Sequence, residues 1–371
     1  RQILLLAGLF LKVSFVSAAP ANVSKAGCQW QLVHSPNVKG GAGNEFRATS
    51  AISANDVWAV GDNTNPGILH TLTEHWDGNS WKIVPSRHPS GTGNIFYGVA
   101  AVSTNDVWAV GSYGASKQPS STLVEHWDGT QWSVVPSPNI ANVNNILTAV
   151  TAVSSNNIWA VGNYQNGSFT LIEHWDGIQW SIVPSPSPSN INSALYGVTA
   201  ISANDIWAVG YSFFFKSNEQ TLTEHWNGTQ WSVVSSPNIP HVLGNFLDSV
   251  SAVSSNDVWA TGSTVEGQAP ILHWNGTRWT LVPGPNFKQI GSLLNAVVAV
   301  SSNDVWATGG LGRLSQQSLI EHWTGTQWKQ VSSPSPGTNE NQFFGAALVP
   351  GTTQVWTVGV ADGETLTAFH C

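Results

Sequence analysis

Methionine is absent from this chain of 371 residues, and charged side chains make up only 9% of it. The 13 basic residues are outnumbered by 21 acidic ones and form no cluster, which argues against a nucleic-acid or anionic-membrane partner. No segment repeats its apolar residues with the period of a helix, which argues against a helical fold. No zinc-type ligand spacing, nucleophile elbow or phosphate-binding glycine motif occurs, so we expect no metal and no cofactor.

The first residues predict export from the cell. An apolar run ending in small residues near Ala18 is typical of a secretory signal, and Lys12 shortens that run below the length of a membrane span. Since no Met is present, we expect the true start to lie upstream. The predicted organisation is a signal over 1–18, a short leader over 19–27 and one domain over 28–371, forming a secreted monomer that lacks a membrane span after signal removal.

Tryptophan, by contrast, is plentiful, and each of the 20 copies occupies one of three positions in a repeat of about 50 residues. The first position is the Trp of N-D-V-W-A-V-G, the second that of E-H-W and the third that of G-T-Q-W-S-V-V-P. The first series is Trp58, Trp108, Trp159, Trp207, Trp259, Trp306 and Trp356; the second is Trp76, Trp127, Trp175, Trp226, Trp274 and Trp323; the third is Trp30, Trp81, Trp132, Trp180, Trp231, Trp279 and Trp328. This period is typical of propellers and solenoids.

Each repeat reads as four short strands. In the second repeat they are expected over 98–103, 107–111, 122–127 and 131–135, with Asp128-Gly129 as a two-residue hairpin turn before the last. Both faces of such strands are apolar, so each sheet must be covered on both sides by its neighbours. Radial stacking satisfies that need. We therefore predict an all-β, seven-bladed β-propeller of four-stranded antiparallel blades.

The two ends of the chain are expected to complete the same blade. Residues 29–33 form a fourth strand with no first three before it, whereas the last repeat lacks its fourth strand. Cys28 and Cys371 align with the two sides of the hairpin turn in the other repeats. Because that places their Cα atoms within the span of a disulfide, we predict a Cys28–Cys371 bond. Two unrelated free thiols are the alternative.

The Glu-His pair before the second Trp recurs in five repeats, at Glu74, Glu125, Glu173, Glu224 and Glu321 with the following His. Adjacent strand residues point to opposite faces, so a pair cannot converge on one metal or substrate. We therefore predict that these residues are buried and hydrogen-bonded between blades, and that they serve stability rather than chemistry.

Differences between repeats concentrate in the loop between the second and third strands and in the Pro-rich join between blades. In an up-and-down blade these emerge on one face, where binding residues tend to gather. The aromatic residues of that face are the predicted ligand-binding residues: Tyr113, Tyr164, Tyr211, Phe213, Phe214 and Phe215. The alternative is that the three Phe fold over their own blade and the Tyr residues cap the sheet edge.

The strings N-D-V-W-A-V-G and H-W-D-G-x-x-W resemble bacterial propeller repeats of the kelch and tectonin kind, over residues 28 to 371. The resemblance implies a propeller and is compatible with lectins, adhesive surface proteins and oxidase domains. The double glycine of kelch repeats, sialidase-type Asp boxes and a galactose-oxidase copper set are not found, so no such activity is carried over.

The favoured interpretation is a secreted, non-catalytic binding propeller that recognises a glycan or a surface protein through its variable face. The first alternative is a glycoside hydrolase or lyase in which loop carboxylates converge on the central pore; the candidates are Asp62, Glu219, Asp248, Glu266 and Glu340. Two such carboxyl groups about 5–10 Å apart would favour hydrolysis. The second alternative is a structural protein of the cell surface.

Overall fold

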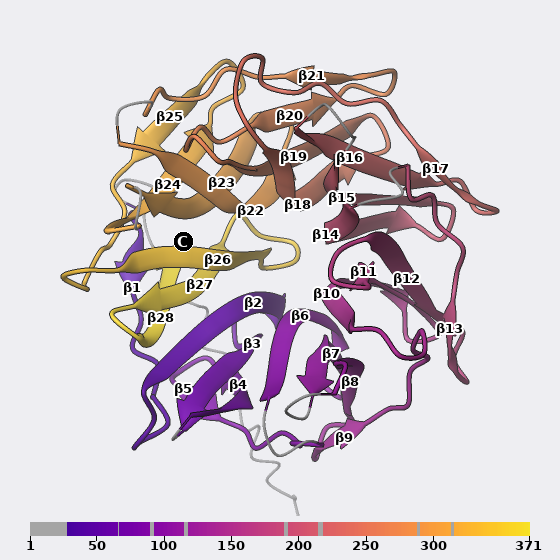
Figure 1. Ribbon diagram of the computed structural model, residues 1–371. Helices are drawn as coiled ribbons and strands as arrows, with labels where there is room; N and C mark the ends of the chain where they lie inside the picture. Colours follow the sequence, from indigo (N-terminus) through magenta and orange to yellow (C-terminus); the bar gives the residue numbers. More distant parts are fainter. Residues whose placement is uncertain are drawn as a thin grey trace, which may run out of the picture.

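The computed structural model describes residues 28–371 except 66, 90–92, 115–117, 189–191, 214–217, 288–289 and 313–314. Every regular element within these residues is a β-strand, and there are 28 of them. They fall into successive groups of four, here called units 1 to 7, arranged around a common centre (Figure 1). The expected all-β propeller architecture is confirmed. No helix of these described residues is long and apolar enough to cross a membrane.

The strands repeat in length as well as in order. The first strands are β2 (Gly43–Ser53), β6 (Gly93–Ser103), β10 (Asn145–Ser154), β14 (Asn192–Ser202), β18 (Asn245–Ser254), β22 (Ser292–Ser301) and β26 (Asn341–Leu348). The second strands are β3 (Asp56–Asn65), β7 (Asp106–Gly114), β11 (Asn157–Tyr164), β15 (Asp205–Phe213), β19 (Asp257–Thr264), β23 (Asp304–Leu311) and β27 (Val355–Ala361). The first strands lie nearest the centre (Figure 1).

The two outer positions of each unit hold shorter strands. The third strands are β4 (Ile68–Trp76), β8 (Ser121–Trp127), β12 (Phe169–Trp175), β16 (Glu219–Trp226), β20 (Ile271–Trp274), β24 (Gln317–Trp323) and β28 (Glu364–His370). The fourth strands are β5 (Trp81–Ile83), β9 (Trp132–Val134), β13 (Trp180–Ile182), β17 (Trp231–Val233), β21 (Trp279–Leu281), β25 (Trp328–Val331) and β1 (Gln31–Leu32).

Units 3 to 7 are separate four-stranded antiparallel sheets, whereas units 1 and 2 share one sheet of eight strands. The link is a single parallel pairing of Leu69 in β4 with Gly93 in β6. It arises because β4 is the longest of the third strands and its first residues reach the start of the neighbouring first strand.

The turn between the third and fourth strands differs from the expected two-residue hairpin. Trp127 pairs with Trp132, so the loop has four residues, Asp128 to Gln131. Asp128 Oδ1 accepts the backbone N–H groups of Thr130 at 2.8 Å and of Gln131 at 2.9 Å. Within the loop only Gly129 has a positive φ, 92°. An Asx turn therefore replaces the predicted type I′ turn, which would need positive φ at both central residues.

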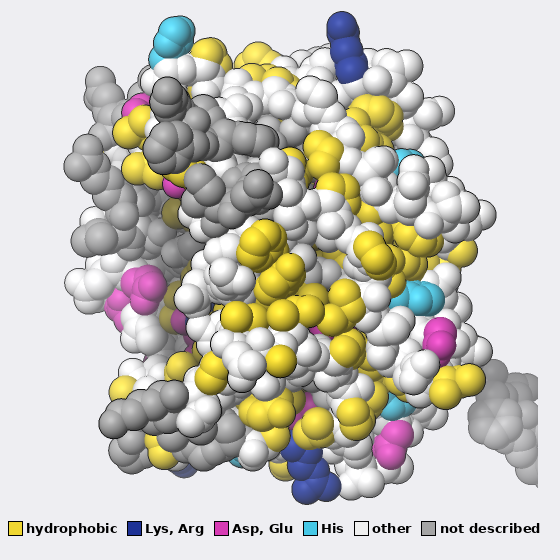
Figure 2. All heavy atoms as spheres, turned by 45° about the vertical axis from the view of Figure 1, so that its right-hand side comes forward, with side chains coloured by type: hydrophobic (Ala, Val, Ile, Leu, Met, Phe, Trp, Pro, Cys, Tyr) yellow, Lys and Arg dark blue, Asp and Glu magenta, His cyan; other side chains and the backbone are white. Residues whose placement is uncertain are grey.

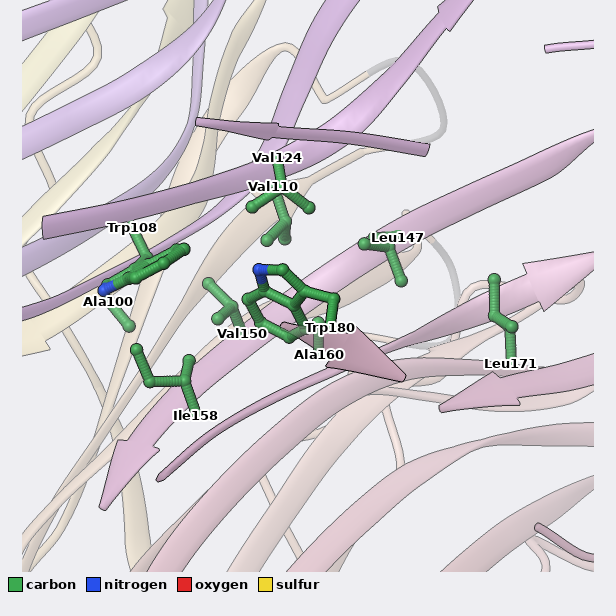
Figure 3. Close-up of a cluster of buried hydrophobic side chains, with 10 residues drawn as sticks. All are labelled: Ala100, Trp108, Val110, Val124, Leu147, Val150, Ile158, Ala160, Leu171 and Trp180. Atoms are coloured by element: carbon green, nitrogen blue, oxygen red, sulfur yellow. The ribbon is translucent and has the colours of Figure 1, made fainter. Parts of the chain in front are cut away.

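The Trp residues pack between neighbouring units. Trp108 of unit 2 contacts Trp175 and Trp180 of unit 3, with ring centroids 5.0 and 5.7 Å apart. Figure 3 shows Trp108 and Trp180 within a buried cluster whose members come from both units. Equivalent contacts occur at the other interfaces, including Trp306 with Trp30 and His370 where unit 7 meets unit 6. The hydrophobic core is thus divided among the interfaces between units.

The chain closes on itself as predicted. Strand β1 pairs with β28, so the sheet of unit 7 has the order β1-β28-β27-β26. A disulfide joins Cys28 to Cys371 with their Cα atoms 5.7 Å apart. The bond replaces the covalent turn that the other units have between their third and fourth strands, and constrains a loop spanning almost the whole described domain. Residues 1–27, which hold the predicted signal and leader, lie outside the described residues.

Candidate functional site

A β-bulge interrupts the first strand of every unit at the same place. In unit 1, Phe46 pairs with Gly61 and Ala48 pairs with Val60, so the intervening Arg47 has no partner on β3. The equivalent register shifts leave out one residue in each of the other six first strands. The bulge residues are Arg47, Tyr97, Thr148, Tyr196, Asp248, Asn295 and Phe344. Bulges often redirect a side chain toward a functional site.

These seven residues, here called the bulge ring, all line one central cavity of about 340 Å³. The residues before each bulge are buried Phe or Leu, and the residues after it are Gly, Ala or Ser. The bulge position itself carries a different kind of side chain in most units. The variation between units therefore extends into the centre of the molecule, beyond the loops and joins where the sequence pattern places most of it.

The glycine that ends N-D-V-W-A-V-G makes the bulge possible. A Cβ on Gly61 would lie 1.9 Å from the carbonyl oxygen of Glu45, and a Cβ on Gly111 would lie equally close to that of Ile95. The remaining units show the same clash at 1.9 to 2.0 Å. Only a residue without a side chain fits against the bulged strand. This repeated glycine is the sequence signal from which the ring could have been found.

Arg47 is held by acidic and aromatic neighbours. Its Nε donates to Asp62 Oδ1 at 2.7 Å, and its Nη1 lies 3.3 Å from Glu45 Oε1. The guanidinium carbon lies 5.2 Å from the ring centroid of Tyr97, the bulge residue of the next unit. Burial raises the pKa of Glu45, an effect that the Arg47 charge opposes. The single cation of the bulge ring is thus neutralised within the molecule.

Asp248 has a different environment. Ser263 Oγ donates to its Oδ2 at 3.0 Å. Burial raises the pKa of Asp248 to about 6, and the Ser263 hydrogen bond opposes that shift. No basic side chain contributes to the pKa of this carboxyl group. Asp248 is therefore the one acidic member of the bulge ring, and it has a neutral partner.

Tyr196 lies beside Asp248 in the neighbouring unit. Burial raises the pKa of the Tyr196 phenol, and the nearby Tyr211 and Asp248 add to that rise. The Tyr196 and Tyr211 hydroxyls are hydrogen-bonded to each other, which helps to hold the Tyr196 ring in place. Thr148 and Asn295 are also fixed, because Thr148 Oγ1 donates to Leu195 O at 2.7 Å and Asn295 Nδ2 to Phe343 O at 2.6 Å.

The sequence-predicted aromatic residues lie at the ends of second strands, all partly exposed where the structure describes them. Tyr211 contacts Tyr196 and Phe246, with ring centroids 5.7 and 5.1 Å apart, which links the predicted face to the bulge ring. Tyr164 stacks on Phe169 of its own unit at 5.1 Å. Tyr113 packs against the core between units 1 and 2. Phe213 pairs with Glu219 across β15 and β16, and Phe214 and Phe215 lie outside the described residues.

The five glutamates of the Glu-His pairs are buried, but the predicted hydrogen bonds are mostly missing. Within the described residues, both carboxyl oxygens of Glu74, Glu173 and Glu224 lack a hydrogen-bond partner. Burial raises the pKa of Glu74 to about 9 and that of Glu173 to about 8. Glu125 differs, because its Oε2 accepts the backbone N–H of Arg87 at 3.1 Å, and its pKa is raised only to about 7.

The histidines of these pairs are hydrogen-bonded within their own unit and not between units. His126 Nε2 donates to Asp106 Oδ1 at 2.9 Å, and Trp108 Nε1 donates to the same oxygen at 2.8 Å. His75, His225 and His322 make the same bond to the Asp that precedes the Val-Trp or Ile-Trp of their own unit, and His174 makes it to Asn157. His273, which follows Leu272 instead of a Glu, also makes this bond, to Asp257. These contacts support the predicted structural role of the His residues. They stabilise the start of each second strand, next to the turn that precedes it.

One side of the molecule carries few charged side chains. Figure 2 shows that uncharged polar atoms and apolar side chains dominate its described part and that Lys, Arg, Asp and Glu are isolated there. The Pro-rich joins are fixed to the adjacent sheets; for example, Thr122 Oγ1 and Ser137 Oγ are 2.6 Å apart, and Thr170 Oγ1 and Ser185 Oγ are 2.8 Å apart. Ser137 and Ser185 thus tie their joins to the third strands β8 and β12.

The fold and the central cavity together define a β-propeller with a cavity that residues of all seven units line. Solved structures that share this fold include one titled YCF48 bound to D1 peptide, with a TM-score of 0.59 and 15% identity; the match covers 92% of this chain and 94% of that chain. Another is YCF48 from Cyanidioschyzon merolae, with a TM-score of 0.58 and 16% identity; the match covers 92% of this chain and 98% of that chain. At this identity the likeness shows the fold alone. No protein-family model and no curated protein matches the sequence.

Proposed function

We propose that this protein is a secreted, monomeric, seven-bladed propeller that acts by binding a segment of another protein. The observation that carries this proposal is the bulge ring, where seven equivalent positions of an otherwise uniform strand hold Arg, Tyr, Thr, Tyr, Asp, Asn and Phe. If these inward-facing positions served only packing, the same residue would be expected in all units. Their variation between units is better explained by ligand recognition.

The binding surface in this proposal runs from the bulge ring to the aromatic residues of the variable face. Tyr211 connects the two, because its ring contacts that of Tyr196 in the cavity and it lies two residues before Phe213, the last residue of β15. Aromatic rings give contact area at a low cost in conformational entropy, which suits peptide recognition. The structural neighbour solved with a D1 peptide supports a peptide as the kind of ligand. We retain a kelch- or tectonin-type repeat as part of the proposal.

The glycosidase alternative depends on carboxylates that meet across the pore. Asp62 comes from unit 1 and is paired with Arg47, Asp248 comes from unit 5 and is paired with Ser263, and Glu266 accepts the backbone N–H of Leu243 at 3.4 Å. The position of Asp248 in the cavity, with its raised pKa, is the one observation that favours this alternative. We propose that Asp248 acts as a binding group.

Binding of the purified protein to a peptide library and to a glycan array tests the proposal. We expect selection of peptides, and we expect a Tyr211→Ser, Phe213→Ser double variant to bind them at least tenfold more weakly. The matched control is Ile178→Ser, which removes an apolar side chain that is 84% exposed on the face of the constant turns. Selection of glycans alone, or equal weakening by both variants, would contradict the proposal.

A further inference from the structure

The charges around the cavity are unbalanced. Arg47 is the only basic residue of the bulge ring, and it is already paired with Glu45 and Asp62. Asp248 lines the same cavity without a basic partner. Together these four side chains leave a net negative charge at the centre of the molecule. A ligand group that entered the cavity would therefore be attracted if it were a cation.

Aromatic side chains of the bulge ring fit an organic cation. Tyr196 lies in the unit next to that of Asp248, and its ring is held in place by contact with Tyr211. Phe344 lines the same cavity as a second bulge-ring aromatic that carries no polar group. Aromatic faces attract ammonium and guanidinium groups, and the attraction grows when water is excluded. A metal ion would need several oxygen or nitrogen ligands, and no group of three or more His, Cys, Asp or Glu side chains suited to a metal occurs within the described part of the chain.

The volume of the cavity limits the size of the ligand group that can enter it. A volume of about 340 Å³ is at the lower end of the range for small-molecule sites, so it holds a side chain and not a folded element. The walls are closed by backbone packing: a Cβ on Gly197 would lie 3.1 Å from Ser249 Cα, and one on Gly345 would lie 2.7 Å from Ala48 Cα. The first strands of adjacent units are therefore in contact around the cavity.

We propose that the central cavity receives a lysine side chain of the bound protein segment, with Asp248 as the counter-ion and with Tyr196 and Phe344 providing aromatic faces for the ammonium group. This inference rests on the proposed function, because it names the group that a peptide inserts. Asp248 is then a specificity-determining residue. Ser263 is its positioning residue, since the hydroxyl orients the carboxylate without reaching the cavity ligand.

The probe is a pair of capped heptapeptides of Gly and Ser with Lys or the uncharged norleucine at the centre, titrated into the full-length protein by calorimetry. We expect the Lys peptide to bind at least tenfold more tightly than the norleucine peptide. Asp248→Asn should remove that preference, and Asp248→Glu should restore part of it. The matched control is Glu266→Gln, which removes an exposed carboxylate outside the cavity and should keep the preference.

Three results would overturn the inference: equal affinity for the two peptides, including no binding of either; a Lys preference that survives Asp248→Asn in a protein with unchanged thermal unfolding; or Ca²⁺ binding that depends on Asp248 and displaces the Lys peptide. If Asp248→Asn does not fold, Ser263→Ala serves in its place and should reduce the preference. A library ligand without a basic residue, bound through Tyr211 and unaffected by Asp248→Asn, would refute the lysine cavity and leave the proposed function standing.

Discussion

At the scale of single residues, the pKa of the buried Glu125 carboxyl group depends on one backbone N–H donor in the neighbouring join. The join residue whose N–H reaches Glu125 is Arg87. The equivalent residues before Glu173 and Glu224 are Pro138 and Pro186, as shown by the same contact with the third-strand Thr. Proline has no N–H to donate, which explains why these two carboxyl groups lack the partner that Glu125 has.

Arg87→Pro should therefore raise the pKa of Glu125 from about 7 toward the value of about 8 found for Glu173. The backbone accepts proline there in other units, so the fold should persist. The measurement is an NMR titration of the Glu125 carboxyl carbon. Arg87→Ala is the control, because it removes the charge but keeps the N–H. An unchanged titration in Arg87→Pro would show that the hydrogen bond is not the cause.

Buried glutamates also make stability depend on pH. The pKa of Glu173 is raised from 4.5 to about 8 by burial, so the folded state holds a proton that the unfolded state releases above pH 4.5. The contribution to stability is complete below that pH and is lost as the pH rises through about 8. Each tenfold difference in proton affinity between the two states corresponds to roughly 1.4 kcal/mol. The unfolding free energy should fall from pH 5 to pH 9.

Urea unfolding at pH 5, 7 and 9 measures this dependence. Glu173→Gln should be less sensitive to pH than the wild type, because the titrating group is gone. Asp176→Asn, an exposed acid-to-amide change in the same unit, should unfold with the wild-type pH dependence above pH 5, since the pKa of Asp176 is lowered by the backbone N–H groups of its own turn. Equal slopes for Glu173→Gln and the wild type would contradict the account.

At the scale of elements, the repeat strings predicted strand order, blade closure and the disulfide. The Trp series and the missing strand at each end of the chain carried those predictions, because both follow from counting within the repeat. The four-residue turn after Trp127 and the pairing of Leu69 with Gly93 were not predictable, since the same letters fit either turn and a strand's length depends on its neighbours. The carboxyl groups of Glu74 and Glu173 are exceptions to the rule that buried polar groups are hydrogen-bonded, on which their prediction rested.

The repeated glycine is a sequence signal of the bulge, but the sequence alone does not show that the first strand is bulged. The glycine after Trp-Ala-Val fits the end of a strand, whereas the structure shows that it makes room for the carbonyl group of the bulged strand. Gly111→Ala should destabilise the protein by several kcal/mol, because its Cβ would lie 1.9 Å from Ile95 O. Gly114→Ala should be tolerated, because the nearest non-neighbouring atom is 3.4 Å away. Thermal unfolding compares the two, and equal melting temperatures would refute this role of Gly111.

At the scale of the whole molecule, the stacked units form a frame and the bulge ring places seven side chains of six residue types at its centre. The Trp contacts between units and the Cys28–Cys371 bond hold the frame together, with hydrogen bonds such as that from Thr148 Oγ1 to Leu195 O. The sequence pattern predicts ligand recognition only on the outer loops. Without knowledge of the bulge, the first strands are interpreted as regular strands whose side chains serve packing. The bulge shifts one residue in each strand toward the axis, and only the structure shows where it points.

The central claim is that a ligand binds at the bulge ring, and blocking the cavity tests it most directly. Cys28 and Cys371 are bonded to each other and no free cysteine occurs in the described chain, so Thr148→Cys places a unique reactive thiol in the cavity wall. The measurement is the affinity for a library-selected peptide before and after attachment of a bulky maleimide, with Ile178→Cys as the labelled control. We predict that labelling at position 148 weakens binding at least tenfold and that labelling at position 178 has no effect. Unchanged affinity after complete labelling at position 148 would contradict the claim.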